Sequence, residues 1–305
     1  MELWYRQPAR NWCETLPCGN GRLGGMLYGD PEQEHIQLNE ETVWSGAVMH
    51  RLNPDAYANL PQIRKLLHTG HIPEAESLAV QSLSGTPESG RHYQTLGDLW
   101  LTFDKLDPCR EYRRSLDLEN GVLRVEFVAG ETRYTREIFA NAPDNVLVIR
   151  LKADGPDKMK FTARLTRPGW SDAVGRCGDN TIQMTGSTGN GGVHYCGMLT
   201  ASEVDGDCHT VGEFLCVENA RNVVLLFTAA TGFRYSHPIA ACKKQLQKAA
   251  TRPINDLYSR HQKAYQALYG TMSLRLGNQD DRRPTDERLQ AYRHGTEDPG
   301  LEAIY

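Results

Sequence analysis

The sequence predicts a mainly β fold: a large antiparallel β-sandwich (super-sandwich) with a helical insertion near residues 54–83 and carboxy-terminal linker helices. Three observations lead to this class. Segments in which apolar and polar residues alternate recur between residues 96 and 231. Turn-forming residues separate them at short spacing, which is typical of sandwiches and barrels. Helical periodicity is confined to the insertion and to the residues after Pro238.

The opening block, to about residue 46, is expected to form short strands and turns. Its extended segments are Gly21–Tyr28 and His35–Leu38. Two helices then interrupt the β pattern, because apolar residues recur at helical spacing over residues 54–68 and again over 73–83. We expect these helices to lie across a sheet.

The middle of the chain has the strongest strand signals. Leu123, Val125 and Phe127 alternate with polar neighbours directly after an Asn120-Gly121 hairpin turn. Val223–Phe227 is continuously apolar, as in a strand that is buried on both faces. Further strands are expected at 147–151, 160–165, 181–185, 194–204 and 212–217.

The carboxy-terminal part returns to helices. Helices are expected within residues 237–269, followed by a last short strand at Met272–Leu276, so that residues 1–277 form the sandwich domain. Residues 278–305 are expected to be a linker and the start of a helical domain. In it, Thr285 or Asp286 caps a helix that runs through Arg293.

A second helix start lies close to the last residue. Asp298 stands at an N-cap position and Pro299 at the first helical position, and the sequence stops about two turns later. A helix that begins without ending indicates truncation. The alternative is a short terminal helix docked on the sandwich.

Composition and charge narrow the possible partners. The 305 residues are 39% hydrophobic and 24% charged, which is ordinary globular usage. A formal net charge of −4 gives no general attraction for nucleic acid or for a membrane surface, so neither is expected as a partner. No apolar run reaches the roughly 18 residues that can span a bilayer.

The cysteines and histidines give no sign of a metal centre. Eight cysteines occur without a C-x-x-C pair, so we expect free, buried thiols in a reducing cytoplasm. The absence of a visible secretion signal agrees with that location. The ten histidines lack metal-ligand spacing, and we expect no metal and no cofactor. His261 lies in a helical stripe and is interpreted as a packing residue.

The segment Gly19–Gly24 matches G-x-G-x-x-G, the pattern of dinucleotide-binding loops. Its context argues against that function, since Pro17 precedes it and a strand-like segment rather than a helix follows. We interpret it as a tight Asn-Gly turn between strands. Asn20 and Arg22 are then exposed at its tip, either to contact a neighbour or simply as parts of the turn.

The segment Gln37–Gly46 gathers amide, carboxylate and indole groups. Gln37, Asn39, Glu40 and Trp44 are the types of side chain that bind sugars through hydrogen bonds and aromatic stacking. The alternative is a strand end with a buried tryptophan and solvated acids.

These two segments, Leu16–Gly24 and Ile36–Gly46, together resemble the paired opening motifs of family 95 glycoside hydrolases, which are mainly α-L-fucosidases with some α-L-galactosidases. Cys18 and Thr95 depart from the family pattern, where a larger apolar residue and a proline are usual. The resemblance runs from residue 3 to the last residue. Supporting segments follow in family order at Asn53–Ala56, Gly70–Ala79, Tyr93–Leu99, His261–Gly277 and Pro284–Leu289.

The resemblance implies an amino-terminal sandwich that precedes a helical linker, an (α/α)6 catalytic barrel and a small β domain. The catalytic acid, and the residues that handle the attacking water, would lie in the barrel, so no catalytic residue is assigned to this chain. The barrel and, in the whole enzyme, an oligosaccharide substrate are the implied partners. Candidate interface or sugar-proximal residues are Asn20, Arg22, Gln37, Asn39, Glu40, Trp44 and Gln94.

Other functions stay open at this point. The chain could be a stand-alone carbohydrate-binding module, or part of a related glycoside phosphorylase with a similar sandwich. The resemblance is also compatible with secretion. If the chain is an isolated amino-terminal piece, it should be inactive, and the apolar surface that a barrel would cover should make it self-associate.

Overall fold

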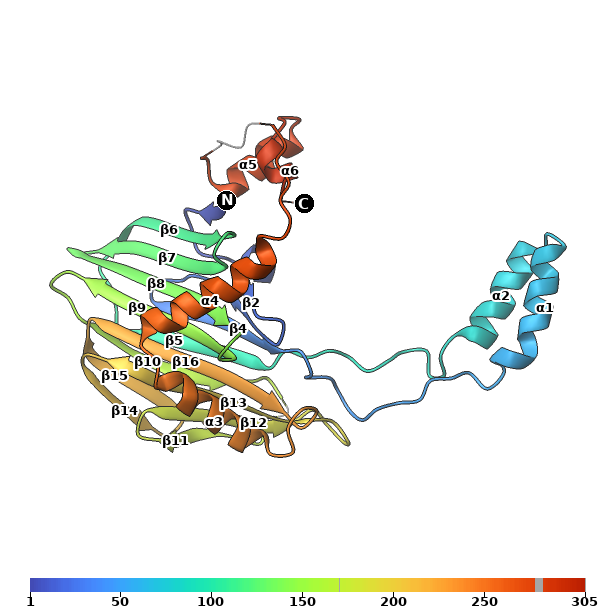
Figure 1. Ribbon diagram of the computed structural model, residues 1–305, viewed down its shortest axis with the longest axis horizontal. Helices are drawn as coiled ribbons and strands as arrows, with labels where there is room; N and C mark the ends of the chain where they lie inside the picture. Colours follow the sequence, from blue (N-terminus) through green and yellow to red (C-terminus); the bar gives the residue numbers. More distant parts are fainter. Residues whose placement is uncertain (170, 278–281, 305) are drawn as a thin grey trace.

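The computed structural model describes residues 1–169, 171–277 and 282–304. Two stacked sheets form a sandwich, and a helical arm extends from one of its ends (Figure 1). The strands of one sheet follow the order β1-β6-β7-β8-β9-β16-β13-β12-β11, and those of the other follow β14-β15-β10-β5-β4-β3-β2. All neighbouring strands pair antiparallel, which confirms the predicted fold class.

The bounds of the elements are as follows. The strands are Glu2–Tyr5 (β1), Leu16–Gly19 (β2), Leu23–Leu27 (β3), Gln33–Glu40 (β4), Gly97–Phe103 (β5), Cys109–Asp117 (β6), Val122–Ala129 (β7), Thr132–Asn141 (β8), Val146–Asp154 (β9), Met159–Thr166 (β10), Ala173–Gly178 (β11), Thr181–Ser187 (β12), His194–Val204 (β13), Asp207–Val211 (β14), Phe214–Ala220 (β15) and Asn222–Thr231 (β16). The helices are the 3₁₀ turn Trp12–Glu14 (η1), Ala56–His68 (α1), Ile72–Leu83 (α2), Pro238–Ala250 (α3), Ile254–Tyr269 (α4), Thr285–Arg293 (α5) and Pro299–Glu302 (α6).

The core lies between the two sheets and follows from the alternation of side chains along each strand. Leu99, Phe127, Ile149 and Phe227 are among its almost fully buried members. Strand β16 is buried on both faces as predicted, because Leu225 and Phe227 enter this core whereas Leu226 faces a second apolar layer. The larger sheet is therefore the middle layer of three.

The third layer consists of α3 and α4, which cover the outer face of the nine-stranded sheet (Figure 1). Leu246 of α3 and Leu257 of α4 are buried in the layer that also contains Val148 and Met198 of the sheet. His261 is also buried here. Its Nε2–H donates to the carbonyl of Asn120 over 2.8 Å, so the structure confirms the packing role that its helical stripe predicts.

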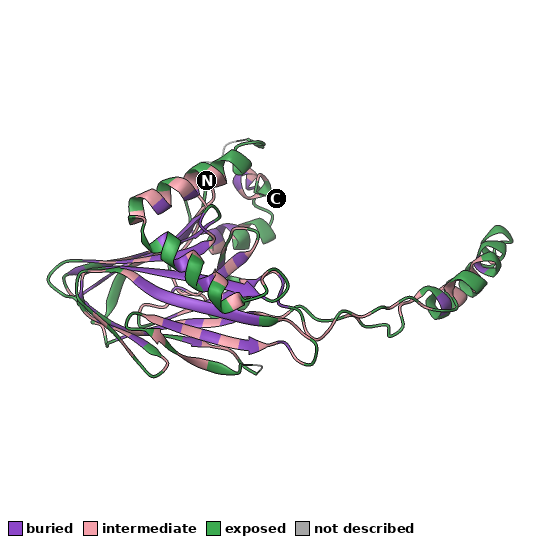
Figure 2. Cartoon of the chain, turned by 60° about the horizontal axis from the view of Figure 1, so that its bottom comes forward, coloured by how far each residue is buried: buried purple, intermediate pink, exposed green. Residues whose placement is uncertain are grey.

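The helical insertion forms where the sequence predicts it, but the prediction of its position is wrong. Helices α1 and α2 pack against each other at the end of two extended stems, and they project away from the sandwich instead of lying across a sheet (Figure 2). An amphipathic pattern shows that a helix needs an apolar partner, and here each helix supplies part of that partner for the other.

Two expectations for the carboxy-terminal part are also wrong. Met272–Leu276 is not a strand, because its alternating residues meet no strand edge and are largely exposed. Helix α5 forms as predicted, but neither Thr285 nor Asp286 caps it, because Pro284 occupies the N-cap position. Asp298 does cap α6, accepting from the backbone N–H of Leu301 over 3.0 Å. Part of the predicted linker, residues 278–281, lies outside the described residues.

The thiol prediction holds in part. All eight cysteines are free, but only Cys196 and Cys242 are fully buried, and Cys13 and Cys109 are exposed. Within the ranges that the structure describes, no helix combines the length and apolar character needed to cross a membrane.

Candidate functional site

The alternation of β4 divides the predicted site residues between two faces of the seven-stranded sheet. Gln37 and Asn39 point outward and are partly exposed, whereas Glu40 points inward and has no exposed surface. The candidates therefore fall into two groups. We call the outer group the aromatic–amide row (Trp12, Gln37, Asn39, Trp44 and Tyr93) and the inner group the Arg22 network (Arg22, Glu40, Thr42, Thr231, Tyr235 and Gln245).

The aromatic–amide row places three exposed rings around two amides. The indole N–H of Trp12 donates to Gln37 Oε1 over 2.8 Å, and the hydroxyl of Tyr93 donates to Asn39 Oδ1 over 3.3 Å. Trp44 meets Tyr93 edge to face, with ring centroids 5.5 Å apart. Trp12, Trp44 and Tyr93 are 53%, 47% and 44% exposed, which contradicts the alternative of a buried tryptophan at Trp44.

This arrangement is chemically suited to a polar ligand with an apolar face. Because the carbonyl oxygens of both amides accept bonds from the rings, the NH₂ groups of Gln37 and Asn39 are left as donors. Rings beside amide donors are a combination that binds pyranose sugars, whose C–H face stacks and whose hydroxyls accept. Burial raises the pKa of Tyr93, and Glu40 and Glu41 add to this effect, so its hydroxyl stays protonated at neutral pH.

A second aromatic cluster continues the row along β4, and the sequence interpretation missed it. His35 stacks between Tyr28 and Trp100, with ring centroids 4.3 and 4.0 Å away, and its Nε2 lies 2.6 Å from Asp98 Oδ1. The signal was available, because His35 lies two residues before Gln37 and therefore faces the same side of the strand. The outer face of this sheet is consequently rich in rings and polar groups.

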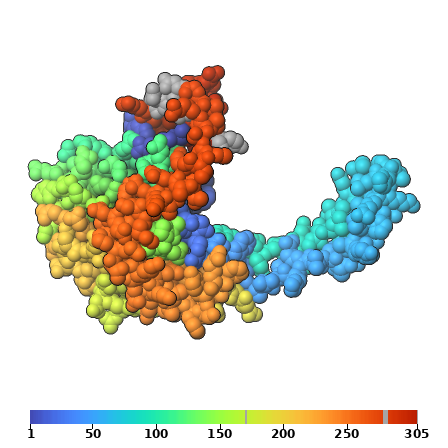
Figure 3. Space-filling view, in the orientation of Figure 1, coloured from blue at the N-terminus to red at the C-terminus, as the bar shows by residue number. Residues whose placement is uncertain are grey.

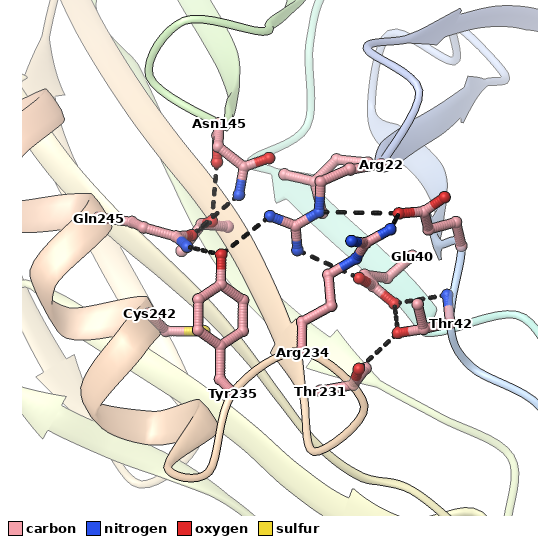
Figure 4. A network of polar contacts seen from close by, with 12 residues as sticks. Arg22, Glu40, Thr42, Asn145, Thr231, Arg234, Tyr235, Cys242 and Gln245 are labelled. Atoms are coloured by element: carbon pink, nitrogen blue, oxygen red, sulfur yellow. Dashed lines mark hydrogen bonds and ion pairs between the residues drawn. The ribbon is translucent and has the colours of Figure 1, made fainter.

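The Arg22 network, in contrast, is an internal anchor (Figure 4). Arg22 donates to Glu40 Oε1 over 3.2 Å and to the hydroxyl of Tyr235 over 3.1 Å. The other oxygen of Glu40 accepts from the backbone N–H and the hydroxyl of Thr42, over 2.7 and 2.5 Å, and that hydroxyl also bonds to Thr231. Gln245 of α3 completes the network by donating to Tyr235.

The electrostatics of Arg22 agree with an ion pair to Glu40 at the centre of this network. Burial alone would lower the pKa of Arg22, but its hydrogen bond to Glu40 and its contact with Tyr235 outweigh burial and raise the pKa overall. Glu40 has no accessible surface, so it cannot contact a sugar or activate a water molecule on the surface. The network joins the β2–β3 turn, the end of β4 and the β16–α3 loop.

Asn20 and Gln94 also have structural partners. Asn20 Oδ1 accepts from the backbone N–H groups of Arg22 and Leu23, and its amide donates to the carbonyl of Asn141 over 3.2 Å. The Asn-Gly turn between strands is therefore confirmed, with Gly21 at a φ of 86°, but the prediction that Asn20 and Arg22 are exposed at its tip is wrong. They are partly buried, because the turn folds back onto the sandwich.

Gln94 lies at the base of the returning stem, where Arg167 holds it. The guanidinium of Arg167 donates to Gln94 Oε1 over 2.7 Å and to the carbonyls of Thr95 and Leu96 over 2.7 and 3.0 Å. Burial lowers the pKa of Arg167. Sequence reasoning missed Arg167, since nothing local to it indicates a partner 73 residues away.

The other buried acids of the described chain have structural roles. Glu34 pairs with Arg136 over 2.8 Å, Asp144 with Arg260 over 2.8 Å, and Asp298 pairs with Arg288. In the residues that the structure describes, no three His, Cys, Asp or Glu side chains are grouped so that they could hold a metal ion. The arrangement can position segments and bind a polar surface.

Comparison with known proteins finds two family matches that follow each other along the chain. Residues 3–236 match the family described as glycosyl hydrolase family 65, N-terminal domain, and residues 253–305 match the glycosyl hydrolase family 95 catalytic domain. The first match ends just before α3, and the second begins beside α4.

Curated relatives match along nearly the whole chain. It is 29% identical to alpha-L-fucosidase 2 of Arabidopsis thaliana over 99% of its length, and 29% identical to probable alpha-fucosidase A of Aspergillus niger over 95%. The chain spans 40% of the length of each of these proteins.

A solved structure described as a putative kojibiose phosphorylase from human microbiome is similar over 86% of this chain and 36% of its own, with a TM-score of 0.54 and 10% identity. At that identity the likeness concerns the fold alone. The chain thus belongs to the glycosyl hydrolase family 65 N-terminal domain family, and it is an amino-terminal region of the family 95 type.

Proposed function

We propose that this chain is the non-catalytic amino-terminal domain of an inverting α-L-fucosidase-like glycoside hydrolase that acts on fucosylated oligosaccharides. One observation carries the proposal: similarity to α-fucosidases runs along almost the entire chain and passes from an N-terminal-domain match into a family 95 catalytic-domain match. The sandwich would support the catalytic domain and shape its surroundings.

The burial of Glu34 and Glu40 supports a non-catalytic role for these two acids. Inversion requires a carboxylic acid and a carboxylate about 6.5–9.5 Å apart, with a sugar and a water molecule between them. Glu34 and Glu40 have no exposed surface, and each is held by an arginine. Burial raises the pKa of Glu34 in spite of Arg136, but no sugar can reach it.

Within the proposed enzyme, the aromatic–amide row is the surface assigned to the catalytic domain or to the rim of its sugar pocket. Trp44 and Tyr93 would provide ring faces and edges, and Gln37 and Asn39 would provide amide donors. The Arg22 network and Arg167 would act indirectly, by holding the two stems between which Trp44 and Tyr93 meet.

The test is fucose release from fucosylated oligosaccharides by two purified proteins: the 305-residue chain and the product of the complete gene. We expect turnover only from the complete protein, with inversion of the anomeric configuration by NMR. Release of fucose by the 305-residue chain would contradict the assignment. Turnover that requires phosphate would replace it with a glycoside phosphorylase.

A second candidate function is independent carbohydrate binding, because the rings of the row are open to solvent in this chain. Calorimetric titration of the 305-residue chain with fucose and with fucosylated oligosaccharides tests it. Binding that the Trp44→Ala variant loses would establish a lectin-like role for the row. Absence of heat with all ligands would leave the row as a surface for another protein domain.

A further inference from the structure

The exposed apolar side chains of this chain are concentrated in two segments. One is residues 44–93, which we call the arm, and the other is the carboxy-terminal segment, by which we mean residues 268–277 and 282–304. In the arm, Val48, Leu52 and Tyr57 are 91%, 89% and 89% exposed, and Val80 is 66% exposed. In the carboxy-terminal segment the most exposed apolar side chains are Leu268, Met272 and Leu274. Surface of this kind marks an interaction site.

The arm is an ordered element, because its two stems are bonded to each other along their length. Near the sandwich, the backbone N–H of Ser45 donates to the carbonyl of His92 over 2.9 Å. Farther out, Arg51 Nε donates to the carbonyl of Pro87 over 2.8 Å. At the helices, Asn53 donates to the carbonyl of Ser84 over 3.1 Å. The stems therefore hold the α1–α2 tip at a defined place.

The base of the arm is fixed to the sandwich on both sides. Thr188 donates through its hydroxyl to the carbonyl of Trp44 over 2.6 Å, and its own carbonyl accepts from the backbone N–H of Gly46. The Arg22 network holds the outgoing stem, and Arg167 holds the returning one. Both stems are therefore fixed where the arm leaves the sandwich.

The tip buries few side chains within itself. Helices α1 and α2 have 13 and 12 residues, a length at which isolated helices are marginal in water. Only Ile63, Ala75 and Ser82 are buried between them. Further apolar contact must come from a partner if the tip is to be as stable as the sandwich.

We propose that the arm is a docking element for the family 95 catalytic domain, and that the remainder of this domain sits between the arm and the carboxy-terminal segment. This inference rests on the proposed function. Figure 3 shows open space between the arm and the carboxy-terminal segment, bounded by the body of the sandwich. Residues 253–305 match the catalytic domain of that family, so the carboxy-terminal segment that borders this space is itself part of the proposed partner.

Charge and size agree with this occupant. The arm contains four basic residues (Arg51, Arg64, Lys65 and Arg91) and four acidic ones (Asp55, Glu74, Glu76 and Glu88), so these charges balance and give the arm no preference for a strongly charged partner. Because the chain covers only 40% of its α-fucosidase relatives, most of their length is available to fill the space.

Amide hydrogen exchange tests the inference on the complete gene product and on the 305-residue chain. Peptides from α1 and α2 should exchange at least about tenfold more slowly in the complete protein, because docking suppresses local opening of the tip. Peptides from β16 should exchange alike in both proteins. Equal exchange of α1 and α2 in the two proteins would overturn the docking role.

A variant separates docking from folding. In the complete protein, Val48→Ser, Leu52→Ser and Tyr57→Ser together should return exchange of the tip to within about twofold of the 305-residue chain. The matched control is Val211→Ser with Phe214→Ser, two exposed apolar residues on β14 and β15, which should leave it unchanged. Neither set should move the urea midpoint of the 305-residue chain, because the replaced side chains are exposed.

The remaining outcomes are distinguishable. A complete protein that releases fucose while its arm exchanges freely refutes docking and leaves the proposed function intact. A complete protein without fucosidase activity refutes the proposed function, whatever the arm does. Protection of the arm that appears in the 305-residue chain as its concentration rises, and is missing from the complete protein, would identify a second copy of this chain as the occupant and overturn the inference.

Discussion

The two outer faces of the sandwich differ in what lies against them. On the nine-stranded sheet, outward residues such as Val148 and Met198 are apolar, and α3 and α4 cover them. On the seven-stranded sheet, His35, Gln37 and Asn39 point outward and remain partly exposed beside aromatic rings. The chemistry of the outward residues thus distinguishes a face that the chain fills itself from a face that is available to a partner.

The strongest test of the covered face is Leu257→Ala. Leu257 is a buried residue of α4 and is 1% exposed. Its truncation should lower the free energy of unfolding by about 2–5 kcal/mol, measured by urea denaturation. Leu268→Ala on the same helix is the control, because Leu268 is 78% exposed and should change stability by less than about 0.5 kcal/mol. Similar losses for both variants would mean that α4 is not fixed on the sheet.

The second-largest expected loss of stability concerns the Arg22 network. Glu40→Ala leaves the backbone N–H of Thr42 and one guanidinium nitrogen of Arg22 without their acceptor. It should lower the free energy of unfolding by about 1–3 kcal/mol, measured by urea denaturation. Glu41→Ala is the matched control, since Glu41 is 37% exposed in its pairs with Arg22 and Arg234 and should cost less than about 1 kcal/mol. Equal effects would show that the network does not hold the stem.

His261 should make the covered face sensitive to pH. Burial lowers its pKa below the ordinary 6.5, although hydrogen bonding with Asn120 and neighbouring backbone partly opposes this. Because the folded state favours the neutral ring, its contribution to stability is fully present above pH 6.5 and is lost as pH falls through the folded pKa. His261→Gln should reduce the fall in stability between pH 7.5 and 5, measured by denaturation at each pH. An identical pH profile would argue against burial of the ring.

The open face should show the smallest effect on stability. Trp44→Ala should change the unfolding free energy of the 305-residue chain by less than about 1 kcal/mol, since the ring makes mainly an edge contact with Tyr93. In the proposed complete enzyme the same change should raise KM for fucosylated oligosaccharides by about 2- to 10-fold if the row touches sugar. Phe214→Ala serves as the control on the same sheet. Unchanged kinetics and unchanged stability of the complete enzyme would exclude the row from both interface and pocket.

Asn20 has a structural role, although the sequence places it among the sugar-proximal candidates. Its amide caps the β2–β3 turn, so Asn20→Ala should destabilise the chain by about 0.5–1.5 kcal/mol and leave KM of the complete enzyme unchanged. Thermal unfolding and initial-rate kinetics measure the two parts. A raised KM with unchanged stability would return Asn20 to the sugar-facing group.

Local pattern predicts much of this fold, and its failures have local causes. Strands with clean alternation, such as β10 and β12, form at or close to their predicted positions. The predicted strand at residues 212–217 begins too early, because Gly212 has a φ of 58° in the turn between β14 and β15. Strands β6 and β8 were missed, because charged residues occupy inward as well as outward positions: Arg114 and Arg136 are buried.

The candidate site could be predicted as a set of residues but not as an arrangement. Ile36 and Leu38 are core residues of β4, so the outward direction of Gln37 and the inward direction of Glu40 follow from the sequence once the strand is known. The contact of Arg22 with Tyr235 does not follow, since 213 residues separate the two. Contacts of that range depend on how the sheets stack, which no local pattern specifies.

The docking of α5 on β1 has a consequence for the order of folding during synthesis. Strand β1 lies at the edge of its sheet, and the backbone N–H of Trp4 donates to the hydroxyl of Thr285, which is 281 residues away. A ribosome adding residues at about 5–20 per second therefore needs at least about 14 s to supply the group that closes this edge. Until then the outer edge of β1 is uncovered, and strands of neighbouring nascent chains can pair with it.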